Sequence, residues 1–235
     1  MNDFMAIKNP PSKRLFDLII GTGILFIAAP LMIIVALLIV VEQRCNPIFS
    51  QRRTGLGGSE FIIYKFRTMS EPLQDGEKPL FVSASDPYVT RLGRILRNTS
   101  IDELPQLFNV LKGDMSIVGP RPQPLNHLSY YGSRIKNYLM RLQMKPGITG
   151  LVQITPLRYE VDNIVKHAAR VHFDLYYIRH WTLFLDIWIC WKTFCLVLNP
   201  KMILAQDKYF TKLRAMTALE EQNDIVDKFI VDPHG

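Results

Sequence analysis

The sequence lacks the short motifs that mark several large classes of nucleotide-binding and metal-dependent enzymes. It has no G-x-x-x-x-G-K-[ST] phosphate loop, no G-x-G-x-x-G turn, no H-E-x-x-H pair and no D-x-D triplet. Cysteine is scarce, and Cys45, Cys190 and Cys195 form neither a C-x-x-C pair nor a zinc-spaced set with histidine. The three thiols are therefore predicted to be reduced and cytoplasmic. His127, His167, His172 and His180 are interpreted as ordinary surface or packing residues.

Length and charge set broad limits on what the chain does. With 235 residues, 48% of them hydrophobic, it is long enough for one sizeable core and too short for two. Lysine and arginine exceed the acidic residues by 28 to 21, which gives a net charge of +7. This excess favours anionic partners such as phosphates, lipid head groups or nucleic acid, without choosing among them.

One long apolar run predicts a membrane segment. Residues 18–41 contain no charge, and 16 of these 24 residues are Leu, Ile, Val or Phe. The run is too long for the core of a signal peptide. Pro30 lies near its middle, where it removes a backbone hydrogen bond and bends a helix. Basic residues flank the run on both sides: Lys8, Lys13, Arg14, Arg44, Arg52 and Arg53. Two basic ends favour a re-entrant hairpin over the alternative of a kinked span.

A second apolar segment, residues 181–198, is interrupted by Asp186 and Lys192 and is not expected to span a membrane. Its aromatic residues recur at spacings of three and four, as expected for an amphipathic helix lying in the membrane interface. A core helix with aromatic packing remains the alternative.

The remaining chain is predicted to be helical apart from a small β element. Residues 47–69 contain β-forming runs around Gly57-Gly58 and predict a short antiparallel hairpin. Residues 73–89 are predicted to form a polar loop. Helices are expected at 88–97, from about 101 to 112, at 130–143 and at 161–198. We therefore predict an α+β, mostly helical fold in three parts: 1–46 with the membrane helix, a catalytic domain at 47–200, and a peripheral tail at 201–235.

The stretch from Leu96 to Pro122 contains an adjacent acidic pair, Asp102 and Glu103. Ser100 and Glu103 have the spacing of a capping box, and Pro105 is tolerated in a first turn, so a helix is predicted to begin near Asp102. Such a position favours an ionised carboxylate and a bound phosphate, and an ionised aspartate there can attack phosphorus. Acidic residues at helix starts often serve stability alone.

Basic residues around this pair strengthen the chemical interpretation. Lys65 and Arg67 come from the hairpin, Arg97 ends an arginine series with Arg91 and Arg94, and Arg121 follows the pair. Each alone is more often a solvated surface charge, but together they could supply the donors that a diphosphate needs. Asp102 and Glu103 are also hard oxygen ligands for a divalent cation.

At this point the chain resembles the bacterial sugar transferases, the monotopic polyprenyl-phosphate phosphoglycosyl transferases. The resemblance covers about residues 12–200 and rests on five blocks in the family's order: "KRLFDLIIG" (13–21), "KFRTM" (65–69), "TRLGRILRNTSIDELPQLFNVLKGDMSIVGPRP" (90–122), "KPGITG" (145–150) and "FDLYYIRHWTLFLDIWICWKT" (173–193). It implies a mostly helical domain with a small β element, anchored by a re-entrant helix and interfacial helices.

The resemblance also implies an activity, a site and a location. A phospho-sugar would pass from a UDP-sugar to undecaprenyl phosphate with release of UMP, with Mg²⁺, or alternatively Mn²⁺, as cofactor. Asp102 and Glu103 match the family's catalytic dyad, with Asp102 as nucleophile and Glu103 as base, orienting residue or metal neighbour. Both are also assigned as metal ligands. Lys65, Arg67, Arg97 and Arg121 are assigned to phosphate contact. The implied location is the bacterial inner membrane, with its lipid as a partner and the catalytic domain on the cytoplasmic face. Self-association is left open.

The sequence departs from the family's pattern at three places. Ala29-Pro30 replaces the Ser-Pro of small members, "GLVQ" replaces "GLWQ", and "TPLR" follows it, which leaves the sugar undetermined. Few residues precede Arg14, so a minimal form of the family is expected. Two rivals are weighed: a membrane-attached protein binding nucleic acid or anionic lipid through its charge, and an inactive scaffold of a polysaccharide complex. We expect no nucleic-acid partner.

Overall fold

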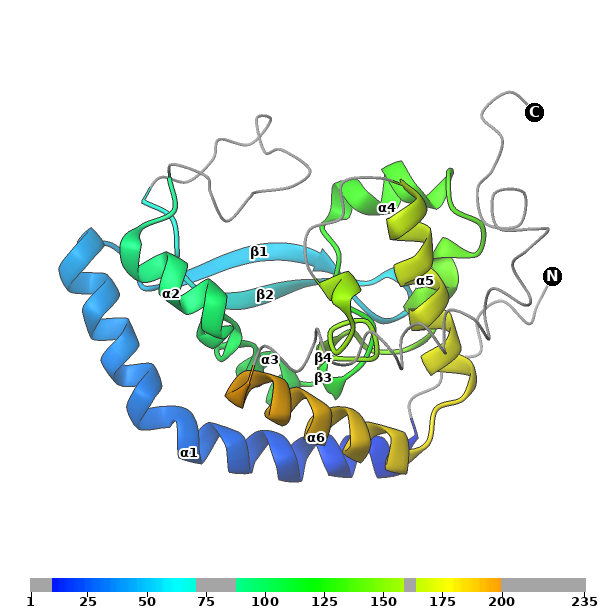
Figure 1. The fold of residues 1–235 in the computed structure, drawn as a ribbon, viewed down its shortest axis with the longest axis horizontal. Helices are drawn as coiled ribbons and strands as arrows, with labels where there is room; N and C mark the ends of the chain where they lie inside the picture. The colour runs from blue at the N-terminus through cyan, green and yellow to red at the C-terminus, as the bar shows by residue number, and fades with distance from the viewer. Residues whose placement is uncertain (1–9, 71–87, 159–163, 200–235) are drawn as a thin grey trace.

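A computed structural model describes residues 10–70, 88–158 and 164–199. The fold is α+β and mostly helical, as predicted (Figure 1). The predicted loop at 73–89 lies mainly outside the described residues, and the predicted tail at 201–235 lies entirely outside them. The α-helices and strands are α1 (Pro11–Gln43), β1 (Ile48–Thr54), β2 (Glu60–Phe66), α2 (Arg91–Thr99), α3 (Gln106–Lys112), β3 (Ser116–Val118), α4 (Leu125–Gly132), β4 (Gly147–Thr149), α5 (Ile164–Arg179) and α6 (Leu183–Leu198).

Helix α1 is long and apolar enough to cross a membrane by length and composition. A proline at its start suits the first turn, where an amide has no helical partner, and Arg44 ends the helix in the left-handed conformation. The ribbon bends part-way along (Figure 1), and Pro30 within the helix supplies the physical cause. Side chains around the bend are exposed, with Phe26 at 83% and Ile27 at 80%. Whether α1 re-enters or spans the membrane stays a prediction.

The predicted hairpin is present, with β1 and β2 antiparallel and in register from Ile48 opposite Phe66 to Thr54 opposite Glu60. The turn uses Gly57 and Gly58 at positive φ, which glycine adopts without steric cost. Phe66 is buried in a small core beneath the second half of α1, which Leu96 of α2 completes. The hairpin therefore packs against the second half of α1.

A second two-stranded sheet, β3 paired in parallel with β4, was not predicted. Each strand has three residues, too short for an alternating pattern to be recognised. Here the backbones of Gly119 and Gly147 approach so closely that a Cβ on either would meet main-chain atoms of the other segment. Glycine at these positions is therefore a packing requirement.

Three predicted helices have different bounds in the structure. The region 161–198 holds two helices, because the chain turns at His180–Thr182 and the Thr182 side chain caps α6 by accepting from the Leu185 amide at 3.1 Å. The predicted helix at 88–97 begins instead at Arg91. The region 130–143 combines the end of α4 with a 3₁₀ turn at Tyr138–Gln143.

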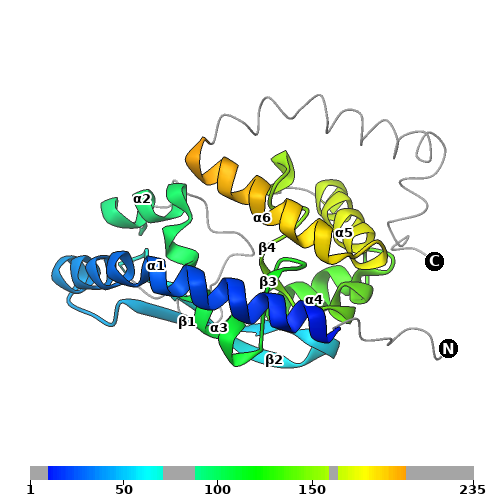
Figure 2. The same ribbon diagram turned by 90° about the horizontal axis from the view of Figure 1, so that it is seen from below.

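The surface of α6 supports the prediction of an interfacial helix over that of a core helix. Its Phe184, Trp191 and Phe194 are exposed, at 76%, 61% and 54%, whereas Ile189 and Leu196 are buried. Figure 2, seen from below, shows the starts of α1 and α6 converging, with the two helices diverging along their lengths. Two apolar surfaces therefore belong to helices that meet at their first turns.

Candidate active site

The acidic pair lies on a 3₁₀ turn, Ile101–Glu103, between α2 and α3. A helical turn therefore begins near Asp102, as predicted, but it is a 3₁₀ turn, and the α-helix α3 begins only at Gln106, after Pro105. The predicted capping box is absent. Ser100 adopts a left-handed conformation with φ 58°, which ends α2 and directs its hydroxyl away from the turn. This hydroxyl accepts a hydrogen bond from the Arg158 guanidinium at 3.1 Å.

Glu103 is held by two of the predicted basic residues. Its Oε1 accepts from Lys65 Nζ at 2.7 Å and from Arg121 Nη2 at 2.9 Å. Burial disfavours the charged form of Glu103, but Arg121 and Lys65 outweigh burial and hold the pKa of this carboxyl well below its usual range. Glu103 is therefore ionised at neutral pH, and it fixes the positions of two cations.

Asp102 differs from its neighbour in both contacts and pKa. It is 9% exposed, and within residues 10–70, 88–158 and 164–199 its carboxylate has no hydrogen-bond partner. Burial raises the pKa of Asp102 to about 6, and the Glu103 charge adds to the rise, whereas Lys65, Arg121 and Arg97 oppose it. The prediction that the helix start stabilises the ionised form is therefore wrong. At pH 7 the group is still mostly ionised, and it carries a raised basicity suited to attack.

The structure separates the other predicted basic residues into two groups. Arg97 lies close enough to lower the pKa of Asp102 and donates from Nε to Thr68 Oγ1 at 3.0 Å. Arg67 donates from Nε to the Asn46 carbonyl at 2.9 Å, and no contact with the acidic pair is found in the described part of the chain. Arg91 and Arg94 are exposed. The site therefore brings together Lys65, Arg97 and Arg121, with Arg67 apart.

Two arginines that the sequence did not assign to this site contact backbone carbonyls of residues 121 and 122, which are called the Arg121 segment below. Arg53, counted as a membrane flank in the sequence, has its Nη1 3.5 Å from the Pro122 carbonyl. Its buried Nε has no hydrogen-bond partner in the part of the chain that the structure describes. Burial lowers the pKa of Arg53 to about 10, and Arg121 adds to the effect. Arg141 donates to the Arg121 carbonyl at 3.1 Å and pairs with buried Asp174. The pairing of Arg141 with Asp174 is a tertiary contact that no sequence spacing reveals.

The donor set is compatible with Mg²⁺ or Mn²⁺ bound together with a substrate. Among the described residues no group of three or more His, Cys, Asp or Glu is found that could hold a metal ion. Mg²⁺ is usually held by one or two carboxylates, with substrate phosphates and water completing the octahedron. The open Asp102 carboxylate fits that role, whereas one Glu103 oxygen is engaged by Lys65 and Arg121.

The histidines meet the expectation of packing residues where they are buried. His167 is 1% exposed and stacks on Tyr131, with ring centroids 3.8 Å apart, while the His127 ring contacts both. Burial lowers the pKa of His167 to about 3, so the ring is neutral. None of these contacts involves the acidic pair.

Residues 8–200 match the family model for bacterial sugar transferases. The chain belongs to the bacterial sugar transferase family. The match includes the acidic pair, the hairpin and both apolar helices. It confirms the resemblance found in the sequence blocks.

Curated relatives include named transferases. A UDP-glucose:undecaprenyl-phosphate glucose-1-phosphate transferase from Caulobacter vibrioides is 44% identical over 181 residues, which cover 77% of this chain and 67% of that protein. A protein of the same name from Klebsiella pneumoniae is 41% identical over 181 residues, 77% of this chain and 39% of its own length. An undecaprenyl-phosphate galactose phosphotransferase from Salmonella typhimurium is 43% identical over 202 residues, 80% of this chain and 40% of its own. The chain thus spans less than half the length of the last two.

Proposed function

We propose that this protein transfers a phospho-sugar from a UDP-sugar to undecaprenyl phosphate and releases UMP. The observation that carries the proposal is the contrast within the acidic pair. Glu103 is neutralised by Lys65 and Arg121. The Asp102 carboxylate has no hydrogen-bond partner among the described residues, and its pKa is about 6. A family of sugar transferases and relatives named for this substrate pair support the same activity.

The proposed first step makes Asp102 the nucleophile. A carboxylate oxygen attacks the phosphorus attached to the sugar, an oxygen–phosphorus bond forms, and the bond to the bridging oxygen breaks as UMP leaves. In the second step a phosphate oxygen of undecaprenyl phosphate attacks the same phosphorus. This step releases the Asp102 carboxylate and gives an undecaprenyl diphosphate sugar. Neither step consumes an oxidant or a further co-reactant.

The basic residues provide the electrostatic part of the mechanism. Lys65 and Arg121 are already fixed by Glu103, so they can meet the diphosphate without reorganising. Arg97 adds a third positive charge near Asp102. Bound Mg²⁺ would supply further charge neutralisation on the diphosphate, with Asp102 as the nearest open ligand. Glu103 acts in this proposal as the residue that orients the two cations.

The apolar helices fit an acceptor that resides in a membrane. The exposed side chains of α1 and α6 are suited to lipid, and together they would keep the acidic pair at the membrane surface. We place the protein in the bacterial inner membrane with the active site on the cytoplasmic face. The product would begin the assembly of an exopolysaccharide, O-antigen, capsule or glycoprotein glycan.

The test is UMP release by the full chain in lipid nanodiscs, with and without undecaprenyl phosphate. A panel of UDP-sugars should include UDP-glucose and UDP-galactose, because the relatives are named for glucose and galactose. With at least one sugar we expect UMP release to exceed one equivalent per protein only when the acceptor is present, and we expect none with Asp102→Asn. Wild-type turnover by that variant would refute the assigned role. Salt-sensitive DNA binding that survives loss of both acids, without UMP release, would favour the rival binding protein.

A further inference from the structure

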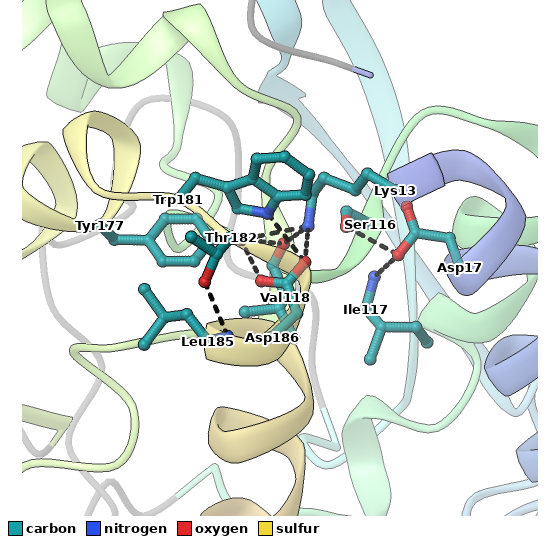
Figure 3. A network of polar contacts seen from close by, with 10 residues as sticks. All are labelled: Lys13, Asp17, Ser116, Ile117, Val118, Tyr177, Trp181, Thr182, Leu185 and Asp186. Atoms are coloured by element: carbon teal, nitrogen blue, oxygen red, sulfur yellow. Dashed lines mark hydrogen bonds and ion pairs between the residues drawn. The ribbon is translucent and has the colours of Figure 1, made fainter. Parts of the chain in front are cut away.

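A fully buried lysine lies at the start of the membrane helix. Lys13, in the first turn of α1, has a side chain that is 0% exposed (Figure 3). Its Nζ donates to Asp186 Oδ2 at 2.7 Å, to the Val118 carbonyl at 2.8 Å and to the Tyr177 hydroxyl at 3.1 Å. All three ammonium protons therefore have partners, so this lysine is part of the protein interior and does not contact lipid head groups.

Asp186, the partner carboxylate, is also 0% exposed. It accepts from Lys13, from Trp181 Nε1 at 2.9 Å and from the Tyr177 hydroxyl at 2.6 Å (Figure 3). Burial and the Asp186 charge raise the pKa of Tyr177, so the phenol stays protonated and serves as the donor. A buried ion pair is costly to desolvate and is retained only with such complete hydrogen bonding.

The cluster joins four elements that are distant in sequence. Lys13 begins α1, Asp186 belongs to the first turn of α6, Tyr177 is near the end of α5, and Val118 ends β3. Lys13 and Asp186 are 173 positions apart. Figures 1 and 2 both show the starts of α1 and α6 side by side at this point. The two helices with exposed apolar faces are therefore tied to each other and to the end of one strand.

That strand leads directly to Arg121. Val118 is three residues before Arg121, and the backbone between them is fixed by two hydrogen bonds, Gly119 N to the Thr149 carbonyl and Gly147 N to the Pro120 carbonyl, both 2.9 Å. Because of these hydrogen bonds, a displacement of Val118 should also displace Arg121.

The Arg121 end of the segment 118–121 is also held by a buried ion pair. Arg141 donates to the Arg121 carbonyl and is itself paired with Asp174 of α5. Asp174 and Tyr177 are three residues apart and share one face of that helix. One helix face therefore supports both ends of the segment whose arginine donates to Glu103 at 2.9 Å.

We propose that Lys13, Tyr177 and Asp186 are positioning residues that hold Val118, and through it Arg121, against Glu103. The same contacts set the first turns of α1 and α6, so the seating of both membrane-facing helices and the placement of a phosphate-binding arginine are coupled. This inference rests on the proposed function, because it takes Arg121 to be a phosphate ligand.

Two variants remove the contacts without leaving an unpaired buried charge. Tyr177→Phe deletes the hydroxyl that donates to Asp186 and Val118 and accepts from Lys13, and it leaves the Lys13–Asp186 ion pair in place. Lys13→Met combined with Asp186→Asn removes both charges together. The contacts of Lys13, Tyr177 and Asp186 with one another and with the Val118 carbonyl are called the clamp below. Thr182→Ala is the matched control, since it weakens the start of α6 by deleting the cap on Leu185 and removes none of the clamp contacts. All are measured as full chains in nanodiscs.

The first measurement is hydrogen–deuterium exchange of peptides covering residues 116–124, which needs no catalytic activity. Both clamp variants should exchange faster in this segment than the wild type, and Thr182→Ala should not. Unchanged exchange in both clamp variants would overturn the clamp. If the wild type releases no UMP from any UDP-sugar, the proposed function fails, and the clamp is judged on exchange alone.

The second measurement is kcat/KM for the UDP-sugar, determined together with kcat. Misplacing Arg121 should lower kcat/KM by between about 10- and 100-fold in both variants, whereas Thr182→Ala should leave it unchanged. Faster exchange with unchanged kcat/KM would overturn the positioning role, as would equal effects from Thr182→Ala.

Discussion

Replacing the proposed nucleophile should make the folded protein more stable. In the folded chain the pKa of Asp102 is about 6, against an ordinary value of 3.8, because the carboxylate is buried beside Glu103. Each pKa unit corresponds to about 1.4 kcal/mol, so keeping this group ionised costs the fold about 2 to 3 kcal/mol. Asp102→Asn removes that cost. At about 2 to 4 °C per kcal/mol for a chain of this size, Tm should rise by about 4 to 12 °C at pH 8.

The pH dependence fixes the sign of this prediction. A raised folded-state pKa means that the cost is fully present above pH 6 and fades as the pH falls towards 3.8. The gain in Tm from Asp102→Asn should therefore shrink by more than half between pH 8 and pH 4.5. The assay is thermal unfolding in nanodiscs at both pH values, with Glu60→Gln, an exposed carboxylate paired with Arg52 at 3.4 Å, as control. No gain at pH 8, or an equal gain at both, would refute the reasoning.

Three further predictions concern the pair, the membrane helix and the metal. Glu103→Gln should reduce kcat. It should also shift the acidic limb of the pH–rate profile below its wild-type position near pH 6, because the Glu103 charge raises the pKa of Asp102. A shift to higher pH would contradict this prediction. Trp191→Glu on the exposed face of α6 should increase the amount of protein released from anionic vesicles in a sedimentation assay. The control Tyr130→Glu, on an exposed residue of α4, should not. Equal release by both variants would contradict a membrane-binding role for the exposed face of α6. Chelation by EDTA should stop UMP release and added Mg²⁺ should restore it; metal-independent turnover would count against the cofactor.

The features that could be predicted from sequence are those with a local cause. The hairpin follows from β-forming runs around Gly57-Gly58, and the bend in α1 follows from the chemistry of Pro30. The long apolar helix α1 follows from an uninterrupted apolar run. The acidic pair and its neighbours Lys65 and Arg121 were predicted together from the sequence, and the structure brings both cations into contact with Glu103.

The features that were missed depend on contacts between distant segments. The β3–β4 pair has three residues a strand, and the break before α6 depends on Thr182 accepting from Leu185, a signal that the aromatic periodicity obscured. The start of α3 was misplaced because Ser100 takes a left-handed conformation that a capping pattern cannot reveal.

Charge was the least reliable guide to environment. Lys13 counted in the sequence as one of the basic flanks of a membrane segment, yet its side chain is buried against Asp186. Arg53 counted in the same way and lies instead beside the Arg121 segment. A sequence shows that a residue is basic, and only the fold shows which carboxylate or carbonyl it meets.

The most direct test of the central claim is mass spectrometry of the wild-type chain mixed with a UDP-sugar that it accepts, without undecaprenyl phosphate. Attack by Asp102 predicts a phospho-sugar adduct on the peptide that contains this residue, formed together with UMP and lost when the lipid phosphate is added. Full turnover in the presence of acceptor with no adduct at any stage, or an adduct on another residue, would contradict the account.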